Sequence, residues 1–214
     1  YTYRKNLGQE LAKENHIDAD VIIPVPDSGV PAALGYSQES KIPFELGIIR
    51  NHYVGRTFIE PSQSIRQFGV KLKHNANSSY IKNKKVILID DSIVRGTTAK
   101  KIIKMVYDAG AKEVHLGIAC PPIKHPDFYG IDTPDYNELI AAKSSLKEIN
   151  NVIGSKSIFF LSLEGTYKAM GYEKRDNETP QFTDHCFTGD YPTSLLDREQ
   201  GTVSKQFSLL SEKN

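Results

Sequence analysis

Short apolar runs alternate with longer segments of mixed polarity along most of the chain. Runs of this length, rich in Val and Ile and bounded by turn residues, are typical of strands buried on both faces of a parallel sheet. They predict strands at residues 20–25, 44–49, 86–89, 113–119 and 157–163. The segments between them predict helices at residues 1–15, 31–40, 97–109, 144–153 and 164–170. This alternation indicates an α/β fold with a doubly wound, mainly parallel sheet.

The most informative stretch follows the apolar run 86–89. That run leads directly into Asp90 and Asp91, and Gly96 with two threonines then opens the next predicted helix. Ligands of open α/β sheets bind beyond the carboxyl ends of the strands, where both carboxylates are expected. Gly96 allows a close backbone approach, and N–H groups at a helix N-terminus form a seat for phosphate. Because neighbouring side chains on a strand end diverge, the two carboxylates suit two sugar hydroxyls, or a hydroxyl and a metal ion.

A second strand-end turn has the same organisation. Residues 20–25 are followed by Asp27, Ser28 and Gly29, and a predicted helix comes next. Taken alone, this composition is that of a common turn. Together with the turn after Asp91, it indicates the second part of one ligand site.

Residues 90–98, Asp-Asp-Ser-Ile-Val-Arg-Gly-Thr-Thr, resemble the signature with which type I phosphoribosyltransferases bind 5-phosphoribosyl 1-pyrophosphate (PRPP). The order of residues in this stretch resembles that of the amidophosphoribosyltransferase family. The resemblance covers most of residues 1–195 and belongs to the phosphoribosyltransferase half of those enzymes. It implies a sheet of the type I phosphoribosyltransferase kind and a small hood lobe, to which residues 123–138 contribute.

The resemblance also implies roles for individual residues. Asp90 and Asp91 are expected to act in catalysis and, with Ser28, to hold Mg²⁺. PRPP is expected to be bound by Asp27, Ser28, Gly29, Ser92, Arg95, Gly96, Thr97 and Thr98.

Residues 50–74 form a long connection with several basic side chains. Connections of this length are usually functional lids or disordered segments, and a solvated basic loop is the simpler interpretation. Residues 53–58, Tyr-Val-Gly-Arg-Thr-Phe, however, resemble the flexible catalytic loop of amidophosphoribosyltransferases. The resemblance implies that Tyr53 and Arg56 close over PRPP and stabilise the departing pyrophosphate, since arginine suits bidentate phosphate contacts.

Composition excludes several other classes of protein. The 27 Lys and Arg residues balance 26 Asp and Glu residues, so charge gives no support for nucleic-acid binding. No apolar run approaches the ~20 residues of a membrane span, and no signal-peptide pattern opens the chain. The sequences G-x-G-x-x-G and G-x-x-x-x-G-K-[S/T] are absent, which argues against dinucleotide-binding and P-loop proteins. We expect a cytoplasmic protein.

The two cysteines, Cys120 and Cys186, cannot form a disulfide framework or a zinc site, and we expect buried structural thiols. Some relatives carry an iron–sulfur cluster bound by four cysteines. Cys186 keeps one of those positions, whereas Asp127 and Thr183 stand at others. One cysteine cannot hold a cluster, so no iron–sulfur cluster is expected.

The 214 residues suffice for one α/β domain with a small lobe. We expect a phosphoribosyltransferase domain over residues 1–195 and a polar, mobile tail over 196–214. In the family, a glutaminase domain with an amino-terminal cysteine nucleophile precedes this half in the same polypeptide. Tyr1 is not such a nucleophile, so we expect a fragment, a processed chain or an excised domain that uses free ammonia rather than glutamine.

The resemblance thus implies an enzyme, a pentosyltransferase that makes 5-phosphoribosylamine from PRPP and ammonia. In the complete enzyme the ammonia comes from glutamine, and the reaction is the first step of de novo purine biosynthesis. A homo-oligomer and feedback inhibition by purine nucleotides are further implications. One alternative is a regulatory protein that senses PRPP or a nucleotide with the same fold, and another is a salvage phosphoribosyltransferase acting on a nucleobase.

Overall fold

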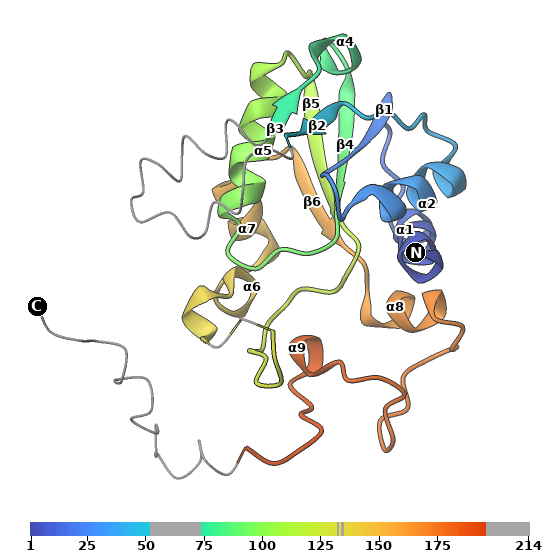
Figure 1. The fold of residues 1–214 in the computed structure, drawn as a ribbon, viewed down its shortest axis with the longest axis vertical. Helices are drawn as coiled ribbons and strands as arrows, with labels where there is room; N and C mark the ends of the chain where they lie inside the picture. Colours follow the sequence, from blue (N-terminus) through green and yellow to red (C-terminus); the bar gives the residue numbers. More distant parts are fainter. Residues whose placement is uncertain (52–73, 132, 134, 196–214) are drawn as a thin grey trace, which may run out of the picture.

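A parallel sheet forms the centre of the molecule (Figure 1). The computed structural model describes residues 1–51, 74–131, 133 and 135–195. Within these residues the main sheet has the strand order β1–β4–β5–β6, and every neighbouring pair is parallel. The strands are β1 (Val21–Pro24), β4 (Lys85–Asp90), β5 (Glu113–Ile118) and β6 (Ser157–Phe160). The mainly parallel α/β sheet is therefore confirmed, although β6 ends earlier than the apolar run suggested.

Helices cover both faces of this sheet, as a doubly wound fold requires (Figure 1). Adjacent strand residues point to opposite faces. Ile22 and Ile87 join the buried cluster that contains Leu11 of α1 and Ala33 of α2. The side chains next to them in sequence join the cluster beneath α5 and α7. The four helices are α1 (Thr2–Glu14), α2 (Val30–Ser40), α5 (Thr97–Asp108) and α7 (Leu146–Ile153).

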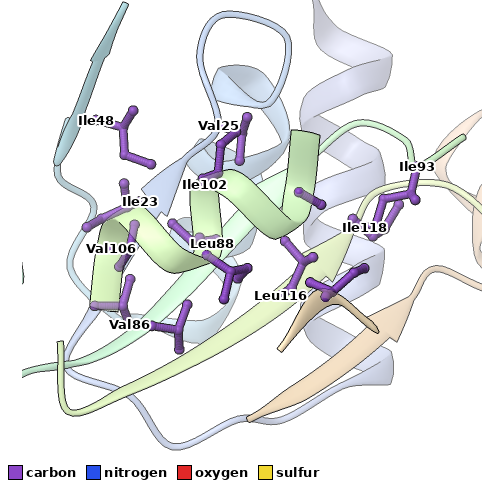
Figure 2. Close-up of a cluster of buried hydrophobic side chains, with 14 of the residues drawn as sticks. Ile23, Val25, Ile48, Val86, Leu88, Ile93, Ile102, Val106, Leu116 and Ile118 are labelled. Carbon is purple, nitrogen blue, oxygen red and sulfur yellow. The ribbon is translucent and has the colours of Figure 1, made fainter. Parts of the chain in front are cut away.

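The cluster under α5 is the larger of the two cores (Figure 2). Ile102 and Val106 of α5 lie over Leu88 of β4 and Leu116 of β5, and all four are at most 2% exposed. Each fully buried aliphatic side chain contributes about 1.5–3 kcal/mol relative to exposure. This packing anchors the helix that follows the acidic pair, and it therefore fixes the position of the helix N-terminus.

The prediction of a strand at residues 44–49 is only partly right. Phe44 makes an isolated bridge to Ile22, and the strand itself is β2 (Ile48–Arg50). It pairs antiparallel with β3 (His74–Ala76) in a separate two-stranded sheet, and α4 (Ser78–Ile81) follows. The sequence did not indicate β3, because three residues reading His-Asn-Ala lack an apolar period.

The remaining segments gather at the carboxyl ends of the main strands, in the lower part of Figure 1. We call residues 120–139 and 171–195 the hood. The Lys124 N–H donates to the Cys186 carbonyl at 2.9 Å, and His185 Nε2 lies 2.8 Å from Asp127 Oδ2 in a buried pair. Short helical elements in and beside the hood are η2 (Tyr136–Glu138), α6 (Ile140–Lys143), α8 (Leu163–Ala169) and α9 (His185–Thr188).

The polar stretch after residue 176, in which the sequence indicates no regular element, contains the short helix α9. One expectation about the hood needs correction. Cys120 and Cys186 are partly exposed rather than buried, although burial still raises the pKa of both thiols. The expected tail at 196–214 lies outside the described residues, and no helix in the described part is long and apolar enough to cross a membrane.

Candidate active site

The two strand-end turns lie side by side, because β1 and β4 are neighbours in the sheet. Pro24 is in register with Ile89, and the N–H of Val25 donates to the carbonyl of Ile89 at 2.8 Å. Between the turns is a cavity of about 370 Å³. Its wall includes Ser28 from the first turn and residues 90–99 from the second.

Most of the predicted site residues therefore meet at this cavity. Those on its wall are Ser28, Asp90, Asp91, Ser92, Arg95, Gly96, Thr97 and Thr98. Asp27 and Gly29 do not line it. Tyr53 and Arg56, the predicted closing residues, lie outside the described residues.

The acidic pair forms one side of the cavity. The Asp91 N–H donates to Asp90 Oδ1 at 2.9 Å, whereas Asp91 Oδ1 lies 3.4 Å from the Ser92 hydroxyl that donates to it. Burial, together with the neighbouring Asp91 charge, raises the pKa of Asp90 to about 8. Asp90 therefore holds a proton at neutral pH in the ligand-free chain. A bound cation would favour its ionised form, and a ligand hydroxyl could hydrogen-bond to either form.

The opposite side of the cavity is built for an anion. Gly96 has φ +74°, a left-handed conformation that turns the chain into α5. Within the described residues, no acceptor is found for the backbone N–H groups from Ser92 to Ala99. Free N–H groups at a helix N-terminus bind phosphate through hydrogen bonds and the helix dipole. Thr97 and Thr98 are exposed there and add two hydroxyl groups.

Gly29 has a steric role in the first turn. Its φ is an ordinary −74°, but a Cβ at this position would lie 2.3 Å from the Ile89 carbonyl oxygen. Its N–H is already donated to the Val25 carbonyl at 3.0 Å. The role of Gly29 in binding PRPP stays a prediction, whereas its small size lets the turn lie against β4.

Arg50 and His74 also line the cavity. The sequence pattern placed both in the long basic connection but assigned neither of them to the site. Arg50 forms an ion pair with Asp27, which links the first turn to β2. Arg50 of β2 and His74 of β3 are paired opposite each other in the two-stranded sheet. The pairing of β2 with β3 joins the two ends of the long basic connection and so brings Arg50 and His74 together at the cavity. Their spacing in the sequence did not predict this contact.

The oxygen ligands at the cavity fit a hard cation that arrives with a phosphate ligand. Among residues 1–51, 74–131, 133 and 135–195, no group of three or more His, Cys, Asp or Glu side chains could hold a metal ion. Mg²⁺ usually keeps several waters and binds one or two protein carboxylates plus substrate phosphates. Asp90 and Asp91 match that arrangement, whereas a metal held by protein side chains alone would need more ligands.

Replacing Gly29 by alanine should destabilise the fold. The added methyl group meets the backbone of β4, so we expect the free energy of unfolding to fall by about 2 kcal/mol or more in urea titrations. Gly154→Ala is the matched control, because a Cβ there has no neighbour within 4 Å and only its φ of +82° is unfavourable. That control should lose about 1 kcal/mol. Equal losses would contradict the steric role of Gly29.

The raised pKa of Asp90 predicts how stability depends on pH. Between the usual pKa of 3.8 and about 8, the folded chain holds a proton that the unfolded chain releases, so stability falls as pH rises. Asp90→Asn removes this titration. From pH 5.5 to 7.5 the variant should gain about 2–2.5 kcal/mol relative to the parent, measured by urea unfolding at each pH.

The control for this measurement is Asp108→Asn, which removes the exposed carboxylate that pairs with Lys104 on α5. It makes the same chemical replacement, an amide for a carboxyl group, without altering the cavity. If both variants show the same pH dependence, the effect is not specific to the buried carboxyl group and the assignment to Asp90 is wrong.

Comparison with known proteins agrees with this geometry. Residues 4–152 match the family model described as the phosphoribosyl transferase domain. An amidophosphoribosyltransferase of Rhizobium etli is 59% identical over 212 residues, which cover 99% of this chain and 43% of that protein. One from Methanocaldococcus jannaschii is 52% identical over 195 residues, covering 91% of this chain and 40% of that protein. The chain thus spans about two fifths of the length of these relatives.

A solved structure shows the same fold. The glutamine PRPP amidotransferase of Bacillus subtilis, in complex with ADP and GMP, has a TM-score of 0.81 and 50% identity to this chain. The match covers 90% of this chain and 42% of that one. The resemblance to amidophosphoribosyltransferases is therefore confirmed, and the chain belongs to the phosphoribosyl transferase domain family.

Proposed function

We propose that this chain is the phosphoribosyltransferase half of an amidophosphoribosyltransferase. It transfers the phosphoribosyl group of PRPP to ammonia and releases pyrophosphate. One observation carries the proposal: a single cavity has two carboxylates on one side and the N-terminus of α5, with its unused N–H groups, on the other. A ribose that carries a phosphate needs both sides at once.

The phosphoribosyl group would lie between these two sides. The 5-phosphate would accept hydrogen bonds from the N–H groups and hydroxyls at Thr97 and Thr98, next to Gly96. Asp90 and Asp91 would bind the ribose hydroxyls. The pyrophosphate group would extend toward Ser28 and the first turn. Mg²⁺, when bound with PRPP, would supply positive charge at the pyrophosphate oxygens.

The chain's own contribution to the reaction would be positioning and electrostatic stabilisation. No covalent nucleophile is required, because pyrophosphate can leave C1 as positive charge develops on the ribose ring, and ammonia then forms the C–N bond. The carboxylates of Asp90 and Asp91 would stabilise that positive charge. Tyr53 and Arg56 are proposed, on the resemblance alone, to stabilise the departing pyrophosphate.

Further parts of the proposal concern the whole protein. The Bacillus subtilis neighbour was solved with ADP and GMP, which supports purine nucleotides as inhibitors that compete for the phosphate seat of this chain. A homo-oligomer, a cytoplasmic location, a role in purine biosynthesis and a glutaminase domain in the same polypeptide are proposed with it.

The direct test is pyrophosphate release from PRPP and Mg²⁺, with either ammonium chloride or glutamine as nitrogen donor. We expect release with ammonium chloride, none with glutamine for this chain, and none with adenine, guanine, hypoxanthine or orotate. Release with a nucleobase would indicate a salvage enzyme instead. Tight PRPP binding in calorimetry without any release would favour a PRPP sensor.

Asp91→Ala should lower the rate of pyrophosphate release by about 100-fold or more, because it removes charge stabilisation at the reacting ribose. The fold should persist, since within the described residues the Asp91 side chain accepts a single hydrogen bond, a long one from Ser92. Circular dichroism checks the fold, and Asp108→Asn serves again as the exposed control. An Asp91→Ala chain with undiminished turnover would refute the assigned role.

A further inference from the structure

Three consecutive residues of the loop after the acidic pair are contacted by one short segment of the chain. The N–H of Ile140 donates to the Val94 carbonyl at 2.9 Å. The Glu138 carboxylate accepts a hydrogen bond from Arg95 Nη2. At Gly96, the place where a Cβ would stand is 3.1 Å from Ile140 Cδ1. Residues 138–140 therefore contact the backbone and one side chain of the loop 94–96, which would bind the phosphate.

The segment that makes these contacts is itself firmly placed. Leu139, between the two contacting residues, is 0% exposed. Its N–H donates to the Tyr136 carbonyl at 3.2 Å, which closes η2, and α6 begins at the next residue. Because the segment is anchored in this way, its contacts restrict the position of the loop.

The Arg95–Glu138 pair is suited to orientation rather than to stability. Both side chains are about 40% exposed, and ion pairs of that exposure contribute little to folding stability. Arg95 lines the main cavity and also a second, open hollow that it shares with Glu138 and Lys143. Among the described residues, Arg95 donates through Nη2 to Glu138, and no acceptor is found for Arg95 Nε or Nη1. The Nε and Nη1 donors of Arg95 therefore remain available at the edge of the cavity, where Glu138 holds the guanidinium.

We propose that Glu138 is a positioning residue for phosphate binding. It fixes the Arg95 guanidinium so that the remaining donors meet the 5-phosphate of a sugar phosphate, while Ile140 keeps the loop backbone in place. This inference rests on the proposed function for its ligand class, a ribose phosphate. It adds a residue from the hood to a site otherwise formed by strand ends and a helix N-terminus.

The test measures the binding of ribose 5-phosphate to the full chain by calorimetry. Because no reaction takes place, the result does not depend on the proposed catalytic activity. Glu138→Ala should weaken binding about 5- to 10-fold, the loss expected for one charge-assisted contact that is no longer oriented. Glu138→Gln keeps an acceptor oxygen and should stay within about twofold of the parent. Glu164→Gln is the matched control, because it neutralises another exposed, ion-paired glutamate that lies on α8.

A double-mutant cycle then asks whether Glu138 acts through Arg95. In an Arg95→Ala chain, adding Glu138→Ala should cause no further loss of binding, because the residue to be oriented is already gone. Fully additive losses would overturn the proposal. Tighter binding by Glu138→Ala alone would overturn it too, since Glu138 would then be withholding Arg95 from the phosphate.

Kinetics provide a second readout that a general structural defect would not give. With PRPP, Glu138→Ala should raise KM by a similar factor and leave kcat within about twofold, since Arg95 would contact the 5-phosphate and not the reacting C1. A fall in kcat with unchanged KM would contradict a positioning role. If the parent binds ribose 5-phosphate but releases no pyrophosphate, the proposed reaction fails while the binding test of Glu138 remains decisive.

Discussion

The close approach of β1 and β4 at their carboxyl ends is the constraint on which the site depends. Their pairing extends past the strands through the hydrogen bond between Val25 and Ile89, and Gly29 leaves no side chain against the Ile89 carbonyl. The two turns are thereby held against one another, and Ser28 faces the same cavity as Asp91. In a parallel sheet all carboxyl ends meet at one edge, so two distant sequence segments can build one site.

Opposite electrostatic demands meet across that cavity. Burial disfavours the ionised form of Asp90, and the charge of the adjacent Asp91 disfavours it further, so the raised pKa keeps a proton on Asp90. A few residues later, the start of α5 presents positive partial charge at Thr97 and Thr98. The site thus separates a region suited to hydroxyls and cations from one suited to phosphate. A ligand that satisfies both is held at two ends, which gives orientation as well as affinity.

The hood contains several buried polar pairs, although Nδ1 of His185 has no hydrogen-bond partner among the described residues. Asp184 accepts hydrogen bonds from Tyr167 and Arg175, and these hold its pKa below the usual value despite the opposing effect of burial. The buried Asp127 carboxylate is hydrogen-bonded to Nε2 of His185 at 2.8 Å. Such pairs are costly to break, because a single buried charge would remain. Nearby in the hood, His125 Nδ1 lies 3.2 Å from the Tyr136 hydroxyl, which connects the hood to the short helical segment that contains Glu138.

The sequence by itself determined the α/β class, the succession of the main strands and helices along the chain, and the carboxylate, glycine and hydroxyl residues that 90–98 bring to one strand end. It could do so because fully buried strands need uninterrupted apolar runs, and because phosphate binding at a helix start needs glycine and hydroxyl residues in fixed order. Tertiary structure decided what has no local signal. Arg50 and His74 reach the site through a short antiparallel pairing, Glu138 reaches Arg95 from far along the chain, and the raised pKa of Asp90 arises from burial and its charged neighbour. These features depend on distances between segments, which a linear pattern of residues does not contain.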